Sequence, residues 1–183
     1  MIDFVVIPEK RLKLLKKNKE WIKKLEEYTG LKIKINKEIF IEGDDSLKIY
    51  RTKLVLKAFG RGFDLETALN LLDENYYFET INIKDYSKKS KNRLITLKGR
   101  VIGTKGKTKR IIERYAEVKI SIYGKTIGII GSWERVMLAK KAIEMLLAGS
   151  LHSTVYRFLE KHKRWKYGRR SYSRKNGKGY ERS

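Results

Sequence analysis

The sequence predicts an α+β protein that contains two copies of one small module, each with a three-stranded sheet covered on one face by three helices. Two observations favour this fold class. One segment of the chain recurs farther along it, and apolar residues follow the same order of strand and helix periods in both halves. The length of 183 residues also fits two small domains.

The internal repeat aligns residues 15–35 with residues 102–122, without a gap, at an offset of 87 positions. With one extra residue in a turn, the match continues to Gly43 and Gly131. The identical pairs within the first stretch are Glu26 with Glu113, Tyr28 with Tyr115, Lys32 with Lys119, Ile33 with Ile120 and Ile35 with Ile122.

Each copy is expected to run strand, helix, turn, helix, strand, strand, helix. In the first copy the strands are predicted at 4–7, 31–35 and 39–41, and the helices before residue 16, at 20–28 and, capped by Ser46, at 47–59. In the second copy the strands are predicted at 77–83, 118–122 and 126–130, and the helices at 91–102, 107–117 and, capped by Ser132, 133–147.

These elements divide the chain into four parts. Residues 1–62 are expected to form the first module and residues 76–160 the second, joined by a short amphipathic linker helix within residues 63–75. Residues 161–183 contain ten Lys or Arg residues and a single acidic residue, Glu181. Such a block predicts a disordered basic tail that contacts nucleic acid.

The charge of the chain predicts a polyanionic partner. A net charge of +23 and a pI near 10.1 favour RNA or DNA, because Lys and Arg release counterions from phosphates. A membrane surface and a thermophile composition are the alternatives. No apolar run is long enough to span a bilayer, no signal peptide is evident, and cysteine is absent, which fits a reducing, cytoplasmic location.

The most informative motif is a Gly-x-x-Gly turn between two predicted helices. A side chain at Gly103 or Gly106 would hinder close approach of an RNA backbone. The N–H groups and the dipole at the start of the following helix favour a phosphate, and Lys105 and Lys107 add positive charge. The pattern predicts the RNA-backbone loop of a KH module.

Two other interpretations fit this segment less well. Gly106-Lys107-Thr108 is similar to the end of a phosphate-binding P-loop, but the first glycine of that motif would fall at Val101, and a helix rather than a strand precedes it. The two glycines could also form a plain helix–turn–helix corner, an interpretation that the flanking charge disfavours. In the first copy the corresponding residues 16–19 contain no glycine, which predicts a degenerate loop.

A longer pattern surrounds the loop and consists of Gly99, Arg100, Gly103, Gly106, Lys107, Thr108, Lys109, Ile112 and Glu113, followed by Ile129, Gly131, Ser132, Leu146, Gly149, Val155 and Tyr156. With this pattern the chain resembles the partner-of-NOB (Dim-two) family of KH proteins in its archaeal form, over roughly residues 1–160 and with the specific motifs in the second module. The first module lacks the loop, as in that family, and a related family known as KRR lacks the Gly-Lys-Thr-Lys run.

The resemblance implies two tandem type I KH domains, the first with a degenerate loop. It implies binding to the single-stranded 3′ end of 16S (pre-)rRNA in the small ribosomal subunit, and cooperation with the PIN-domain nuclease that matures this end. It also implies contact with the α subunit of initiation factor two.

The candidate RNA-binding residues lie on or near the loop. The hydrophobic floor of the groove is expected from the helix before the loop and the strand after it, although plain core packing is the alternative for that strand. The candidates are Arg100, Val101, Ile102, Gly103, Thr104, Lys105, Gly106, Lys107, Lys109, Arg110, Lys119 and Ile120.

Catalysis has little support in the sequence. The only histidines, His152 and His162, have no neighbouring carboxylates, so neither a metal site, a cofactor nor an acid–base pair is expected. The alternatives to a specific RNA-binding protein are an interaction scaffold with a secondary RNA contact and a ribosomal or translation-associated protein.

Overall fold

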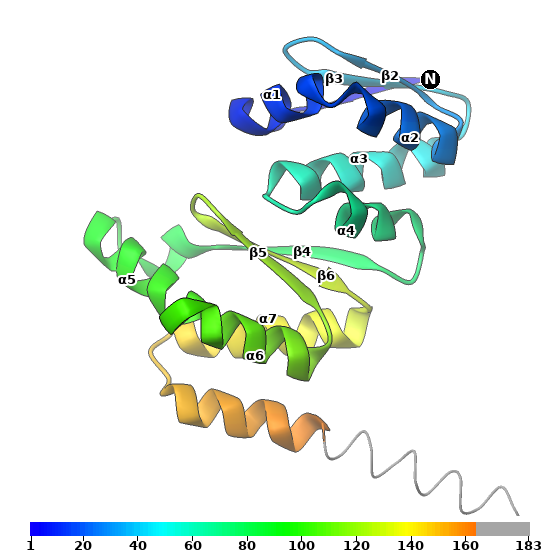
Figure 1. The fold of residues 1–183 in the computed structure, drawn as a ribbon. Coiled ribbons are helices and arrows are strands. Elements are labelled where there is room, and N and C mark those ends of the chain that lie inside the picture. The colour runs from blue at the N-terminus through cyan, green and yellow to red at the C-terminus, as the bar shows by residue number, and fades with distance from the viewer. Residues whose placement is uncertain (164–183) are drawn as a thin grey trace, which may run out of the picture.

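The computed structural model describes residues 1–163, in which two similar halves lie one above the other (Figure 1). The N-terminal half (residues 1–76) and the C-terminal half (residues 77–163) each contain an antiparallel sheet of three strands. The strand orders are β1-β3-β2 and β4-β6-β5, so the strand that comes last in the chain lies in the middle of each sheet. The same connectivity therefore occurs twice, where the sequence repeats.

Most predicted elements lie within two residues of their predicted limits. The N-terminal half contains β1 (Ile2–Val5), α1 (Glu9–Lys17), α2 (Lys19–Thr29), β2 (Lys32–Ile35), β3 (Ile39–Glu42), α3 (Ser46–Gly60), α4 (Leu65–Leu69) and the 3-10 turn η1 (Asn70–Leu72). The C-terminal half contains β4 (Tyr77–Asn82), η2 (Ile83–Tyr86), α5 (Lys91–Ile102), η3 (Thr104–Gly106), α6 (Lys107–Ala116), β5 (Lys119–Tyr123), β6 (Thr126–Gly131) and α7 (Trp133–Leu147).

The repeated glutamate makes the same hydrogen bond in both halves. Glu26 Oε1 accepts from the Ile33 backbone N–H at 2.7 Å, and Glu113 Oε1 accepts from the Ile120 N–H at 2.9 Å. In each case a helix side chain satisfies a donor on an edge strand, which would otherwise be unpaired. The identity of Glu26 and Glu113 therefore has a structural cause.

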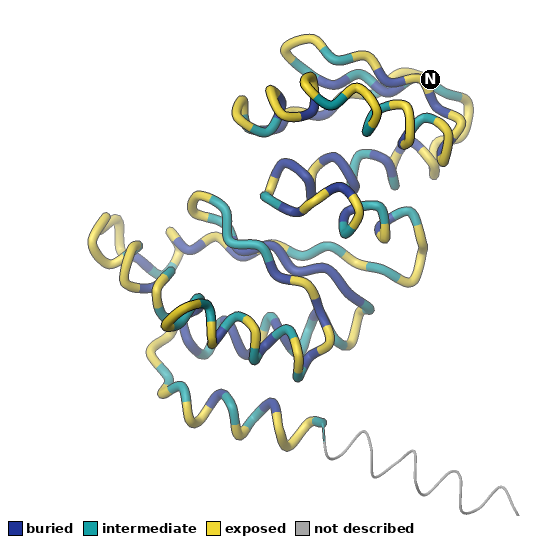
Figure 2. Tube along the Cα trace, viewed as in Figure 1, coloured by how far each residue is buried: buried dark blue, intermediate teal, exposed yellow. Residues whose placement is uncertain are grey.

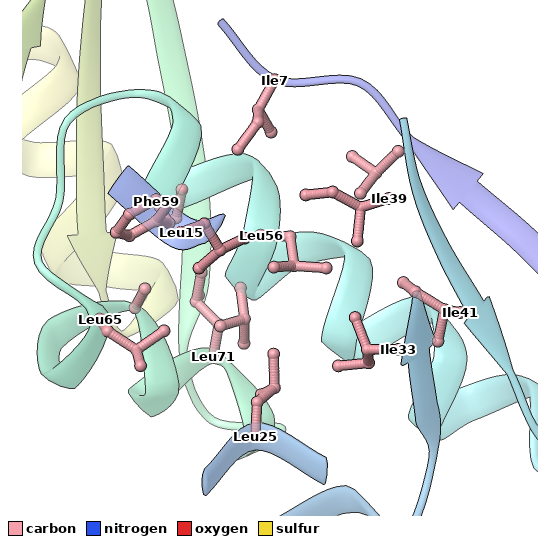
Figure 3. Packing of buried hydrophobic residues seen from close by; sticks show 14 of the residues in the cluster. Ile7, Leu15, Leu25, Ile33, Ile39, Ile41, Leu56, Phe59, Leu65 and Leu71 are labelled. Carbon is pink, nitrogen blue, oxygen red and sulfur yellow. The ribbon is translucent and has the colours of Figure 1, made fainter. Parts of the chain in front are cut away.

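The predicted linker packs into the core of the N-terminal half. Leu65 and Leu71 are buried and lie beside Phe59 and Leu56 (Figure 3). Because these contacts are apolar and continuous with the core, the linker does not act as a free tether.

The two halves also pack directly on each other. The turn before α4 lies over the face of the second sheet that is opposite α5, α6 and α7 (Figure 1). The Phe63 ring meets Phe78 of β4 edge-on, with 6.1 Å between ring centres. Gly128 of β6 makes room for this contact, since a Cβ there would lie 2.7 Å from Phe63 Cε2. Ile130 joins the apolar cluster of the N-terminal half, so both faces of the second sheet are covered.

Polar contacts fix the chain segment between α3 and α4. The Arg11 side chain donates from Nε to the Phe59 carbonyl at 2.8 Å and from Nη2 to the Phe63 carbonyl at 2.6 Å. Partial burial lowers the pKa of this guanidinium from its ordinary value. Across the interface, Ser121 Oγ donates to the Arg61 carbonyl at 2.9 Å. The junction is thus held by donors from both halves.

The predicted helix caps need correction. Asp45, not Ser46, caps α3, and its carboxylate accepts from the N–H groups of Leu47 and Lys48. A carboxylate at this position is also favoured by the helix dipole. Ser132 does precede α7, but its side chain makes no capping hydrogen bond.

A helix that the sequence analysis did not identify follows α7. It spans residues 152–163 and has buried positions along its length (Figure 2). Two of them, Val155 and Leu159, belong to the hydrophobic core of the C-terminal half. Residues 161–163 of the predicted tail continue this helix, whereas the rest of that tail, residues 164–183, lies outside the described residues. None of the helices within residues 1–163 is long and apolar enough to cross a membrane.

The packing predicts opposite effects of alanine at two glycines. Gly128→Ala should lower the free energy of unfolding by about 1–3 kcal/mol, because its Cβ meets Phe63 and Phe78. Gly99→Ala, in α5 and with nothing within 4 Å, should raise it by up to about 1 kcal/mol. Urea denaturation of both variants measures this, and a Gly128→Ala protein as stable as the wild type would contradict the described interface.

Candidate nucleic-acid interface

The loop between α5 and α6 turns through backbone conformations that favour glycine. Gly103 has φ 73° and ψ 173°, a combination that is essentially limited to glycine. Lys105 and Gly106 are left-handed helical, with φ 52° and 73°. The Gly106 N–H donates to the Gly103 carbonyl at 3.2 Å and closes the turn. The requirement for glycine is therefore strictest at Gly103.

Thr108 supports this turn from inside the fold. Its side chain is buried, and a Cβ on Gly103 would lie 2.7 Å from the Thr108 backbone nitrogen. Thr108 Oγ1 and the Tyr156 hydroxyl share a hydrogen bond of 3.0 Å. The helix at residues 152–163 therefore supports the residue that packs against Gly103. This role of Thr108 and Tyr156 was not predicted from the sequence.

Arg100, one of the candidate RNA-binding residues, is directed into the fold. It donates from Nη2 to the Ser150 carbonyl, while His152 Nε2 lies 2.9 Å from the Arg100 carbonyl. The Arg100 Nε is buried and has no hydrogen-bond partner within residues 1–163. Arg100 and His152 together join the end of α5 to the turn after α7.

Five of the candidates are exposed, and four of these carry positive charge. Thr104, Lys105, Lys107 and Arg110 are exposed on the loop and the first turn of α6, and Lys119 is exposed on β5. No side chain caps α6 at Gly106, so the helix dipole is available to an anion there, although the Lys107 N–H already donates to the Thr104 carbonyl. Lys109 differs, because its Nζ lies 3.5 Å from Glu113 Oε1 in an ion pair.

Two of the predicted groove residues belong to the core. Val101 is fully buried and Ile120 is 4% exposed, so neither side chain is available to a base. They hold α5 and β5 in place instead. Ile102 is partly exposed, at the end of α5 next to Gly103. The alternative of plain core packing was thus correct for Ile120.

A pocket of about 890 Å³ extends along the outer side of α6. Lys107, Arg110 and Arg114 line it, and their spacing of three and four residues places them on one helix face. Arg114 was missed among the candidates, although this spacing was visible in the sequence. Lys119 lines the pocket from β5. Arg135 of α7 also lines it, so five cationic residues line one groove that begins directly after Gly106.

The N-terminal half has no such loop. α1 continues through Lys17 and α2 begins at Lys19, so Asn18 alone separates them. The four-residue turn predicted at residues 16–19 is therefore absent. Without glycines, the chain forms no left-handed turn there, and Asn18 has an ordinary φ of −108°.

Metal chemistry has no evident site in the described part of the chain. Within residues 1–163, no group of three or more His, Asp or Glu side chains is arranged to hold an ion. The candidate site is a tight turn at the start of α6 with cations beside it.

The comparisons with known proteins agree with this geometry. Residues 77–164 match the family model of the eukaryotic type KH-domain, KH-domain type I, so the fold and loop of the C-terminal half define a KH domain. Across the whole chain, a KH domain-containing protein of Methanocaldococcus jannaschii is 40% identical over 167 residues, which cover 87% of this chain and 73% of that protein. The chain belongs to the Dim2/PNO1 family of KH proteins.

Two further relatives support this assignment. The Pre-rRNA-processing protein PNO1 of Eremothecium gossypii is 35% identical over 102 residues, which cover 55% of this chain and 38% of that protein. A chain in the crystal structure of an a/eIF2alpha–aDim2p–rRNA complex from Pyrococcus horikoshii is 38% identical, with a TM-score of 0.79. The match covers 90% of this chain and 94% of that chain.

Asparagine substitutions distinguish the two loop glycines. Gly106→Asn should cost about 1 kcal/mol or less in stability, because asparagine tolerates the left-handed region. Gly103→Asn should cost at least about 2 kcal/mol, because of its backbone conformation and the contact with Thr108. Urea titrations compare the two variants, and equal losses would show that Thr108 does not restrict Gly103.

Proposed function

We propose that this protein binds single-stranded RNA through the loop and groove of its C-terminal half and takes part in maturation of the small ribosomal subunit. The observation that carries the proposal is the open turn Gly103–Gly106 followed by an uncapped α6 with exposed lysines. This arrangement suits a phosphate backbone. The likeness to a Dim2p chain from an rRNA complex supports RNA as the ligand.

In this proposal the loop binds the RNA backbone, and the groove determines which bases are bound. Backbone N–H groups at the start of α6 donate to a phosphate, and the helix dipole favours its charge. Lys105, Lys107 and Arg110 neutralise adjacent phosphates. Bases leave the stack and lie against the groove beside α6, since sequence-specific RNA binding uses unstacked bases.

We further propose that the N-terminal half is a second type I KH domain that has lost its loop. Its strand order and its Glu26 hydrogen bond match those of the C-terminal half. Its contribution is structural, because it covers the second sheet through Phe63 and Ile130.

The proposed target is the 3′ end of 16S (pre-)rRNA in the small subunit. Support comes from the name of the PNO1 relatives, which are pre-rRNA-processing proteins, and from the rRNA in the Pyrococcus complex. The same complex supports the initiation-factor-two α subunit as a partner. In this role the protein presents RNA in the cytoplasm, and a PIN-domain nuclease does the cutting.

Charge reversal in the loop tests the proposal. Thr104→Asp with Lys105→Asp should lower affinity for single strands that tile the 3′ end of 16S rRNA by more than about tenfold, because carboxylates repel phosphates. Stability should change little, since both side chains are exposed. Fluorescence anisotropy at fixed salt measures the affinity.

The matched control is Lys17→Asp with Asn18→Asp, which makes the same change in charge at the equivalent point of the N-terminal half. It should reduce affinity far less. If both double variants lose the same affinity, binding depends on overall charge and the protein is a non-specific scaffold.

The basic C-terminus should contribute affinity without sequence preference. Deleting residues 164–183 removes eight Lys or Arg residues and one Glu. Each lost phosphate contact should reduce the slope of log affinity against log salt by about 0.7 for single strands. Titrations at several salt concentrations with the strand panel test this, and a loss limited to one sequence would instead make this segment a specific contact.

A further inference from the structure

The pocket beside α6 has a second wall that does not come from the C-terminal KH domain. Asn70, Asn75 and Tyr76, which join the two halves, line it opposite α6. Tyr76 packs against the hydrophobic core of the N-terminal half, and its carbonyl accepts from Arg51 Nη1 at 3.5 Å. The N-terminal half therefore holds this wall in place across the groove.

The opposite wall of the pocket is basic. Within residues 1–163, Arg110, Arg114 and Lys119 form no ion pair. The two acidic residues of the pocket are already engaged. Glu113 accepts from the Ile120 N–H and pairs with Lys109, and Glu117 pairs with Arg135 at 2.6 Å. The net charge offered to a ligand is thus positive.

The wall formed by Asn70, Asn75 and Tyr76, here called the junction wall, carries two side-chain amide groups. Asn75 Nδ2 donates to Asp73 Oδ1 at 2.9 Å, which orients the amide and leaves its oxygen without a partner among the described residues. Asn70 makes no side-chain hydrogen bond in that part of the chain and is exposed. Between the walls lies the partly exposed side chain of Ile111, whereas Val118 and Ile130 are buried beneath it in the core.

We propose that Asn70 and Asn75 complete a subsite for an unpaired RNA base, next to the nucleotides that the Gly103–Gly106 loop holds. This proposal rests on the proposed function and adds to it a specificity contribution from outside the C-terminal KH domain. An amide offers both a donor and an acceptor to the edge of a base. The partly exposed Ile111 side chain suits the face of a base, and the cations suit its phosphate.

The size and position of the pocket fit this ligand. About 890 Å³ lies within the range of small-ligand sites and is ample for one nucleotide. Lys107 lines the pocket and directly follows Gly106, so a strand that leaves the loop reaches it without a gap. A peptide is the other conceivable occupant, but the unpaired cations favour an anionic chain.

The test compares short and extended RNA strands on the full chain. Since a KH loop holds about four nucleotides, four-nucleotide strands should contact the loop and the start of α6, whereas strands extended by three nucleotides at either end should also reach Asn70 and Asn75. Asn70→Ala with Asn75→Ala should leave affinity for the four-nucleotide strands within about twofold. The same variant should bind the extended strands about tenfold more weakly than the wild type does. It should also show no base preference in the added nucleotides.

The control variant is Asn36→Ala, in the turn between β2 and β3. It should bind the extended RNA strands as tightly as the wild type does. The proposal is overturned if the Asn70 and Asn75 double variant keeps both the tighter binding of extended strands and the base preference, or if no extension improves wild-type binding. Failure of the proposed function gives a different result, because the Thr104 and Lys105 double variant would then still bind the four-nucleotide strands.

Discussion

The backbone conformation of Gly103 is the constraint on which the candidate site depends. Its φ and ψ are open to glycine alone, and the buried Thr108 occupies the space where a side chain would begin. Thr108 is in turn hydrogen-bonded to Tyr156 on the helix at residues 152–163. The direction of the first N–H groups of α6, and hence the place where a phosphate can bind, follows from this arrangement.

The same fold serves two purposes in one chain. In the C-terminal half, glycines interrupt the helix pair and open the start of α6. In the N-terminal half only Asn18 separates the two helices, and the retained fold instead supplies Phe63, α4 and the junction wall that pack on its neighbour. The N-terminal half therefore keeps the strand order of its neighbour without the loop. Because Gly128 has no side chain, the Phe63 ring can pack against this face of the second sheet.

Much of the fold could be predicted from the sequence because local patterns determine it. The limits of α5 and α7 match the predicted ones, and the loop was located from Gly103 and Gly106 alone. Other features depend on tertiary contacts. Alternation in a strand does not show which face is buried, so Ile120 was mistaken for a groove residue. Helical spacing could not show that Arg100 bonds to Ser150, fifty residues away. The junction wall follows only from the packing of the two halves.

Mapping the RNA contacts on the full chain tests the central claim most directly. The protein would be crosslinked to single strands containing 4-thiouridine, and the modified peptides identified by mass spectrometry. Crosslinks should concentrate between Ile102 and Lys119, around the loop and α6, with few on α1 and α2 of the N-terminal half. Crosslinks concentrated on α1 and α2, with the loop and α6 unmodified, would contradict the assignment of RNA binding to the C-terminal half.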